Sequence, residues 1–296
     1  MCPLIPEPLN KEICYSNSSP ERGGIWCVHE RIFFMNNFIT AEGFEKTFRY
    51  AKLIEQGLAV TVMLALFTVV IGFVLGILLA IMRITDVRPF RFLAYGKDGR
   101  IRNNKFLIAV SKFNPLSFFA TAYVEIIRST PVLVQIMIIY HGVFGKLIDI
   151  PSYTVFGFLK TNRFIPGVVA LGMNSGAYLC EIIRSGIQSI EVGQTEAARS
   201  LGMTKTQNLV HIILPQAIKN ILPAIANEFV VIIKESSICY TIGVQDLMFA
   251  VTAVQGANYI VMEPLLVATA VYFCLCFPTS KLIAYFERRM SRGDKR

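Results

Sequence analysis

Residues 57–82, GLAVTVMLALFTVVIGFVLGILLAIM, form an uninterrupted apolar run in which no side chain carries a charge. A helix needs about 20 residues to cross a hydrocarbon core about 30 Å thick, and this run is longer than that. A helix in the core of a soluble protein rarely continues so far without a polar face. The run therefore predicts a membrane-spanning helix, and the fold class it indicates is an all-α membrane protein.

The composition of the rest of the chain also favours a membrane protein. Of the 296 residues, 54% are hydrophobic and 17% are charged, whereas about 25% are charged in a typical soluble domain. Later apolar runs are shorter, and one of them carries acidic and basic residues at membrane depth. Such residues are costly in lipid and usually face protein or an aqueous path. We expect about five spans, near residues 57–82, 119–145, 164–187, 219–243 and 260–286.

The basic residues predict how these spans are oriented. Lys and Arg are concentrated in segments that would share one side of the membrane, residues 83–114, 181–220 and 281–296. Cytoplasmic loops carry the excess of Lys and Arg, so we expect the N-terminus outside and the C-terminus in the cytoplasm. The net charge of +9 then reflects topology and lipid contact. Nucleic-acid binding is not expected, because the sequence has no soluble basic face with interleaved aromatic residues.

Residues 1–56 are expected to form an extracytoplasmic extension with a lead-in helix, and no uncharged run near the start predicts a cleavable signal peptide. Outside the cytoplasm, Cys14 and Cys27 either form a disulfide or remain two free thiols. We assign no function to this extension or to the long basic loop 83–114. The tail 291–296 is expected in the cytoplasm. The remaining cysteines fall in predicted spans as small apolar residues: Cys180, Cys239, Cys274 and Cys276.

A polar, partly basic segment, EAARSLGMTKTQNLVHIILP at residues 196–215, interrupts the apolar sequence. A first short helix is expected from Val192 to Leu201, ended by Gly202 in the manner of a C-terminal cap. Thr204 followed by Gln207 predicts a capping box for a second helix, and we expect this helix to end at Pro215. Two small helices joined by a turn would form a rigid knob, with small and charged side chains that another protein can contact.

The full spacing of this segment resembles the EAA loop of ABC-importer permeases. The matching residues are Glu196, Ala197, Ala198, Gly202, Ile212, Leu214 and Pro215. Further stretches resemble the polar amino-acid uptake branch, which serves histidine, arginine, glutamine and glutamate systems. They are YVEIIRSTPVLVQIMIIYHGVF (123–144), GMNSGAYLCEIIRSGIQSIEVGQTEAARSLGMT (172–204), NEFVVIIKESSICYTIGVQDL (227–247) and FERRM (286–290).

This resemblance implies a type I importer transmembrane domain over residues 57–290, with a cytoplasmic coupling loop at 191–215 that docks onto an ATPase. It also implies a location in the bacterial cytoplasmic (inner) membrane. The implied partners are two ATP-binding-cassette ATPases, a second permease that is identical or homologous, membrane lipid, and an extracytoplasmic solute-binding protein that delivers a polar amino acid. ATP and Mg²⁺ would then be bound by the partner ATPase and not by this chain.

Polar residues inside the spans are candidates for the substrate pathway. In the third span Asn174, Tyr178 and Glu181 fall on one helical face, with Ser175 beside them; the alternative is a hydrogen-bonded seam between helices. The fourth span offers Glu228, Lys234, Glu235 and Ser236, although Lys234 and Glu235 are alternatively explained by pairing with another helix. Two further features are interpreted as structural: Glu125 and Arg128 as an ion pair within one helix, and Pro131 as a residue that shapes the second span.

Other classes of protein are less consistent with the sequence. A permease for another small solute, a secondary transporter and a channel remain alternatives, but a docking loop is not expected in the last two. No H-E-x-x-H, G-x-S-x-G or phosphate-binding G-x-x-x-x-G-K-[ST] motif is present, and the three histidines are scattered. We therefore predict no catalytic residue, no metal site and no ATP site in this chain.

Overall fold

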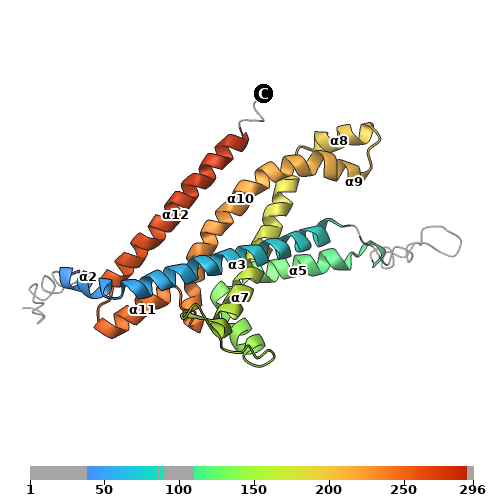
Figure 1. Cartoon of the computed structure of the whole chain (residues 1–296). Coiled ribbons are helices and arrows are strands. Elements are labelled where there is room, and N and C mark those ends of the chain that lie inside the picture. The colour runs from blue at the N-terminus through green and yellow to red at the C-terminus, as the bar shows by residue number, and fades with distance from the viewer. Residues whose placement is uncertain (1–38, 86, 88, 90–109, 292–296) are drawn as a thin grey trace, which may run out of the picture. The chain divides into compact units, whose positions relative to one another are not determined.

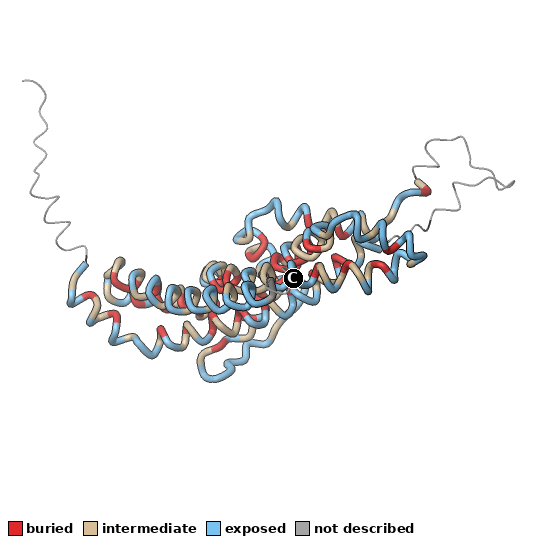
Figure 2. The backbone as a smooth tube through the Cα atoms, turned by 90° about the horizontal axis from the view of Figure 1, so that it is seen from above, coloured by how far each residue is buried: buried red, intermediate tan, exposed pale blue. Residues whose placement is uncertain are grey.

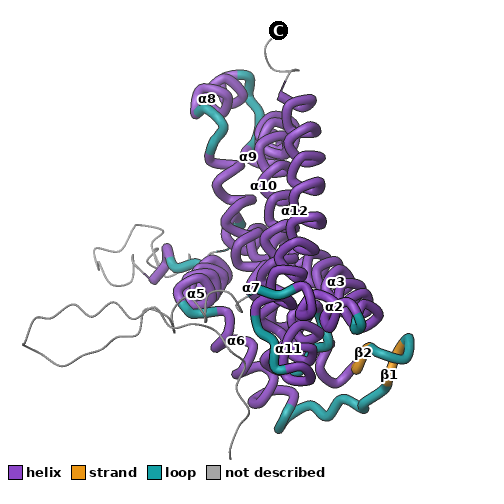
Figure 3. The backbone as a smooth tube through the Cα atoms, turned by 90° about the vertical axis from the view of Figure 1, so that its left-hand side faces the viewer, coloured by secondary structure: helices purple, strands orange, loops and turns teal. Residues whose placement is uncertain are grey.

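The computed structural model describes residues 39–85, 87, 89 and 110–291, and these residues are mostly helical (Figure 1). The helices are α2 (Ala41–Phe48), α3 (Ala51–Ile84), α5 (Pro115–Ser129), α6 (Val132–Ile138), η2 (Ile139–Phe144), α7 (Thr161–Gln188), α8 (Val192–Ser200), α9 (Lys205–Asn208), η3 (Leu209–Ile213), α10 (Leu214–Glu235), η4 (Ser236–Ile242), α11 (Leu247–Asn258) and α12 (Met262–Ser291). Two short strands, β1 (Thr154–Val155) and β2 (Leu159–Lys160), form an antiparallel hairpin (Figure 3). Cys14, Cys27, most of the basic loop 83–114 and the tail 292–296 lie outside the described residues.

Several helices are long and apolar enough to cross a membrane. Among the described residues these are α3, the continuous helical segment Lys205–Ile242 and residues Met262–Arg289 of α12. Helices α5 and α6–η2 make a fourth if the bent pair is one span. Helix α7 has 28 residues but is interrupted by small and polar side chains and is not among these segments. The fold class is that of an all-α membrane protein.

The lead-in to the first long helix is short and capped. Thr40 accepts a hydrogen bond from the backbone N–H of Gly43, so it caps the N-terminus of α2. The backbone N–H of Thr40 also donates to the Glu263 carboxylate at the start of α12, across 2.9 Å. This contact holds the start of α2 against α12. Helix α3 then begins at Ala51, before the uncharged run that starts at residue 57.

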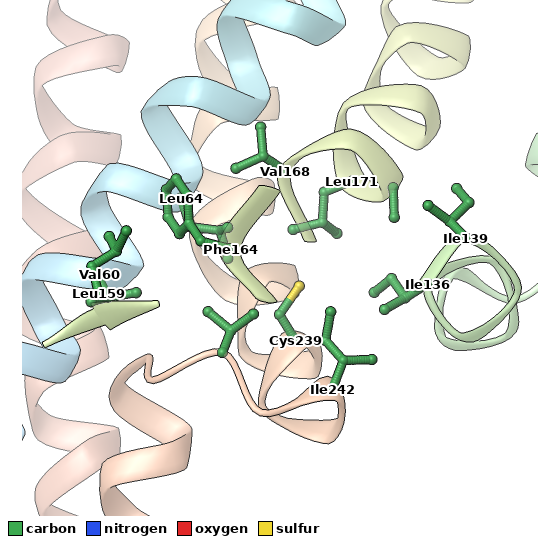
Figure 4. Close-up of a cluster of buried hydrophobic side chains, with 12 residues drawn as sticks. Val60, Leu64, Ile136, Ile139, Leu159, Phe164, Val168, Leu171, Cys239 and Ile242 are labelled. Carbon is green, nitrogen blue, oxygen red and sulfur yellow. The ribbon is translucent and has the colours of Figure 1, made fainter. Parts of the chain in front are cut away.

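The centre of the fold is the close packing of α3 against α7. A Cβ atom added at Gly72 would lie 2.7 Å from the Ser175 hydroxyl, and one added at Gly76 would lie 2.7 Å from Cβ of Leu179. The two helices can approach this closely because α3 presents glycine, which has no side chain, to α7 at these two positions. A cluster of buried side chains continues this contact (Figure 4): Val60, Leu64, Ile136, Ile139, Leu159, Phe164, Val168, Ala170, Leu171, Cys239, Ile242 and Val244.

Buried residues are interrupted by exposed ones along the helices (Figure 2). The exposed residues include many large apolar side chains on α3 and α12, such as Phe67, Val70, Phe273 and Phe277. A soluble monomer rarely exposes such extensive apolar surface. Lipid or other membrane subunits would cover these faces.

Helix α10 corrects one expectation from the sequence. We predicted that the second helix of the loop ends at Pro215, and this prediction is wrong, because the chain remains helical from Lys205 to Ile242. Pro215 lies in the first turn of α10, directly after the π-helical segment η3. There the backbone N–H of Leu214 bonds to the carbonyl of Leu209, five residues earlier. This wider turn accommodates a proline, which lacks an N–H and clashes in a regular helix interior.

Candidate functional site

The first candidate site is the knob formed by α8 and α9 (Figures 1 and 3). Helix α8 ends at Ser200, and Gly202 follows its cap residue with a φ of 81°, in the left-handed region. The N–H of Gly202 bonds to the carbonyl of Arg199, and the N–H of Met203 bonds to that of Ala198. These two bonds are the Schellman arrangement that glycine favours at a helix end. The predicted end of the first helix is confirmed.

The second half of the knob is fixed by a capping box. The Thr204 hydroxyl accepts from the backbone N–H of Gln207, and the Gln207 side chain accepts from the backbone N–H of Thr204. Asn208 links the two halves, because its amide donates to the Thr195 hydroxyl across 3.3 Å. The predicted capping box is confirmed, and it makes the knob a rigid unit.

The surface of the knob is partly apolar. Val192 is 71% exposed and Leu201 is 83% exposed, while Glu196, Ala197 and Arg199 are also exposed. We expected both alanines to form an open surface, and for Ala198 this is wrong, because it is only 4% exposed. The small side chain of Ala198 lets α8 pack within the knob. Of the two alanines, only Ala197 is exposed, where a partner can approach the helix closely.

The remaining residues of the loop pattern lie where the knob joins α10. Ile212 and Leu214 are half-buried, and Pro215 is exposed. The carbonyl of Ile212 accepts from the Gln216 side chain across 2.8 Å. These residues therefore connect the knob to the long helix instead of forming its outer surface.

The helix that follows the knob is longer than a membrane is thick. A 38-residue helix, Lys205–Ile242, is about 57 Å long at about 1.5 Å per residue. A hydrocarbon core is about 30 Å thick. This helix is therefore longer than a membrane crossing requires, and the polar knob is attached at its N-terminal end.

The second candidate site surrounds a break in the second predicted span. Helices α5 and α6–η2 meet at an angle of 110°. Thr130 is extended and Pro131 begins the next helix, as expected for a proline and the residue before it. The interpretation of Pro131 as a residue that shapes this helix is confirmed.

Gln135 satisfies the backbone groups that the break exposes. Its amide donates to the carbonyl of Ile127 across 2.7 Å and to that of Thr130 across 3.0 Å. Its own amide oxygen accepts from the Asn174 side chain of α7 across 2.9 Å. Buried backbone at membrane depth requires such partners. Sequence reasoning missed Gln135, although a glutamine four residues after a proline in an apolar run is a signal that could have found it.

The polar face predicted on α7 divides into different environments. Asn174 is buried and bonded to Gln135, and Ser175 is buried against Gly72 of α3. Tyr178 is exposed, and the Arg128 guanidinium lies over its ring at 5.4 Å from the centroid. The expected ion pair between Glu125 and Arg128 is not among the ion pairs of the described residues, and Arg128 contacts the ring of Tyr178 instead.

Glu181 at the end of this face is held by two arginines. Its carboxylate lies 2.9 Å from Nη1 of Arg83 on α3 and accepts from Nε of Arg184, also across 2.9 Å. Arg184 donates in turn to the Gln188 side chain across 2.6 Å. The arrangement joins the ends of α3 and α7 just before the knob begins.

The candidates of the fourth span are less closely connected. Ser236 is buried, and its hydroxyl donates to the carbonyl of Ile233 in its own helix across 2.8 Å. Glu228 and Glu235 are half-buried and Lys234 is exposed. The alternative pairing of Lys234 or Glu235 with another helix is not seen among residues 39–85, 87, 89 and 110–291. The assignment of these residues to a pathway stays a prediction.

Comparison with known proteins identifies the family. Residues 106–292 match the family described as binding-protein-dependent transport system inner membrane component. The chain belongs to this family. The arginine transport system permease protein ArtQ of Bacillus subtilis is 34% identical over 251 residues, which cover 85% of this chain and 98% of the relative. A putative glutamine transport system permease protein, GlnP of Rickettsia conorii, is 35% identical and covers 80% and 92%.

Solved structures give the same assignment for this permease. The crystal structure of an amino acid ABC transporter with histidines contains a chain that is 38% identical, with a TM-score of 0.68 over 83% of this permease and 98% of that chain. The MetNI methionine ABC transporter in an inward-facing conformation is 16% identical with a TM-score of 0.57 and shares the fold alone. The permease therefore has the type I ABC-importer fold of a multi-pass inner-membrane subunit. In this family the ATPase is a separate subunit, so the permease is not itself an enzyme.

Proposed function

We propose that this permease forms the translocation pathway for a polar amino acid and is driven by a separate ATPase that docks on the α8–α9 knob. The observation that carries the proposal is the knob itself, a rigid and partly apolar surface at the end of a helix longer than a membrane is thick. Movement of a partner on the knob would be transmitted along α10 into the membrane. Alternating access requires such a coupling between the movement of the ATPase and the membrane helices.

The proposal includes the orientation and the partners. The knob and the C-terminus face the cytoplasm and the N-terminus lies outside, because the excess of Lys and Arg marks the cytoplasmic side. Two ATPases bind ATP and Mg²⁺, a second permease completes the pathway, and a binding protein supplies the substrate. The relatives named for arginine and glutamine transport support a polar amino acid as cargo.

The pathway residues form a further part of the proposal. Tyr178 and Glu228 offer polar groups that are not fully buried, and they suit a solute that carries both an ammonium and a carboxylate. Asn174, Ser175 and Ser236 support the helices, because each is buried and packed or bonded within the protein. Glu181 belongs to the arginine contacts at the end of α7.

The test is uptake by membrane vesicles that contain the permease with and without its ATPase. We expect uptake of radiolabelled arginine, glutamine or histidine only when the ATPase, ATP and the binding protein are all present. Uptake without the ATPase would favour a secondary transporter or channel. A binding protein that ignores every amino acid but holds a sugar or an oxyanion would remove the amino-acid assignment and leave the importer assignment intact.

A further inference from the structure

The contact between Arg128 and Tyr178 places a cationic group at the break between α5 and α6. Arg128 lies in the last turn of α5, and its guanidinium carbon is 5.4 Å from the centroid of the Tyr178 ring on α7. Both residues are exposed. A guanidinium that lies over an aromatic ring is attracted by the negative face of the ring. Its five N–H donors point outward from the edge of the guanidinium plane.

Arg128 differs in its hydrogen bonds from three other arginines of the helices around it, Arg83, Arg163 and Arg184. Arg83 and Arg184 donate to Glu181, and Arg163 donates to the carbonyl of Ile242 across 2.6 Å. Within residues 39–85, 87, 89 and 110–291, the guanidinium of Arg128 has the ring of Tyr178 as its contact and no hydrogen-bond acceptor. A charged group without a counter-ion in a predicted membrane span is costly and usually serves a pathway.

Hydrogen bonds hold together the helices that carry Arg128 and Tyr178. Asn174 lies one helical turn before Tyr178 and donates to Gln135, which in turn holds the carbonyl of Ile127 beside Arg128. Tyr123 on α5 donates from its hydroxyl to the carbonyl of Met173 on α7 across 2.9 Å. These bonds fix α5 and α7 relative to each other at the level of the pair. A binding group placed on such supported elements is preorganised.

We propose that Arg128, positioned by the Tyr178 ring, binds the carboxylate of the transported amino acid. The planar guanidinium matches a carboxylate with two parallel N–H···O bonds. Both side chains are exposed, and within the described part of the chain the N–H groups of Arg128 have no acceptor. The inference rests on the proposed function, because it takes an amino acid as the cargo, and it assigns the group that recognises the part common to all amino acids.

The experiment measures equilibrium binding to the detergent-purified complex of the permease with its ATPase. The probes are radiolabelled L-arginine and L-glutamine, each compared with its α-carboxamide, which lacks the carboxylate. We expect the wild-type complex to bind the acids at least about 10-fold more tightly than the amides, as for a hydrogen-bonded charged group. Arg128→Gln should bring the acid-to-amide ratio of dissociation constants close to one. Arg128→Lys should restore part of the preference.

The controls separate this role from folding and from general charge. The ratio is measured within each variant, so a lower fraction of folded protein does not change it. Lys146→Gln removes one exposed positive charge elsewhere and should keep the wild-type ratio. Tyr178→Leu should reduce the ratio, because the guanidinium loses its platform.

Two results would overturn the inference in different ways. If Arg128→Gln keeps the wild-type preference for the carboxylate, the inference fails while the amino-acid function stands. If the wild-type complex binds neither the acids nor the amides, the proposed cargo fails and the inference fails with it.

Discussion

Nη1 of Arg83 lies 2.9 Å from Oε2 of Glu181 and joins the end of α3 to the end of α7, which are 98 residues apart in sequence. The side chains are 14% and 20% exposed, so the pair is mostly shielded from water. Arg184 binds the same carboxylate from within α7. One carboxylate thus serves two cations at the point where α7 leads toward the knob.

This arrangement predicts an asymmetry between two variants. Glu181→Gln leaves both guanidinium groups without their counter-ion and should lower stability by about 3 kcal/mol, as for the loss of one partner of a buried pair. Arg83→Gln leaves the bond between Glu181 and Arg184 in place and should cost about 1 kcal/mol. Thermal unfolding in detergent measures both. Equal losses in the two variants would show that Glu181 does not hold the two arginines together.

Gln135 should be important for the broken span. Gln135→Leu leaves the carbonyls of Ile127 and Thr130, and the amide of Asn174, without their partner. The Asn174 side chain is buried, and an unsatisfied buried group costs about 1–3 kcal/mol, so we expect a drop in the unfolding temperature. Asn174→Leu removes one of these bonds and should cost less. The idea fails if Gln135→Leu is as stable as the wild type.

Asp246 predicts a pH dependence of stability. It lies outside the candidate spans, caps α11 by accepting from the N–H of Phe249 across 2.9 Å, and is fully buried. Burial raises the pKa of this carboxyl from 3.8 to about 7. The folded protein therefore holds the proton more tightly than the unfolded chain does, so stability falls as the pH rises between about 4 and about 7.

Two substitutions separate the charge of Asp246 from its role as a cap. Asp246→Asn keeps an oxygen for the Phe249 N–H and should flatten the decrease between pH 4 and pH 7. Asp246→Ala should also flatten it, but at a cost of about 1 kcal/mol at every pH, because the cap is lost. The measurement is the unfolding temperature across this pH range. An unchanged slope in the asparagine variant would rule out Asp246 as the source.

The close approach of α3 and α7 should not tolerate a side chain. In Gly76→Ala the new methyl group would lie 2.7 Å from Cβ of Leu179 and 3.2 Å from the backbone nitrogen of Cys180. We expect a loss of about 1–3 kcal/mol. Gly256→Ala in α11 is the matched control, because nothing lies within 4 Å of its added Cβ and alanine favours a helix by about 1 kcal/mol. Unfolding midpoints that shift equally in both variants would contradict this account of the interface.

Leu201, the more exposed of the two large apolar side chains named on the knob, should matter for transport. Leu201→Asp places a charge on the proposed docking surface and should abolish ATP-dependent uptake while leaving the amount of protein in the membrane unchanged. Leu147 is also strongly exposed, at 80% against 83% for Leu201, but lies outside the knob. The Leu147→Asp permease should therefore show ATP-dependent uptake at the wild-type rate. Transport by Leu201→Asp at the wild-type rate would refute the docking role of this side chain.

The sequence was most informative where the structure is decided locally. Gly202, Thr204 and Gln207 act within one or two helical turns, so glycine and the capping pair are read correctly from spacing alone. Pro215 led to a wrong prediction of a helix end, because the helix continues through it by means of the π-helical turn before it. Pro131 indicates a break in the second span, but the sequence does not give the bend of 110° that the structure has there.

Contacts between distant residues could not be predicted in this way. Helical spacing paired Arg128 with Glu125, whereas the side chain lies over Tyr178, 50 residues later. The same limit applies to Glu181. Its spacing placed it on a face that lines the pathway, whereas in the structure it pairs with Arg83 of α3. The family resemblance predicted the type I fold because its motif extends over many positions, while the arrangement of individual polar side chains depends on helix packing.

The central claim is that the knob docks the ATPase, and the most direct measurement is the amount of ATPase that purifies with a tagged permease. Gly202→Asp should strain the turn of the knob, since its φ is 81°, and should retain little or no ATPase. Gly157→Asp imposes similar strain at φ 77°, with open space around it, in the β1–β2 hairpin and should retain the ATPase fully. Wild-type amounts of ATPase on correctly inserted Gly202→Asp would contradict the account.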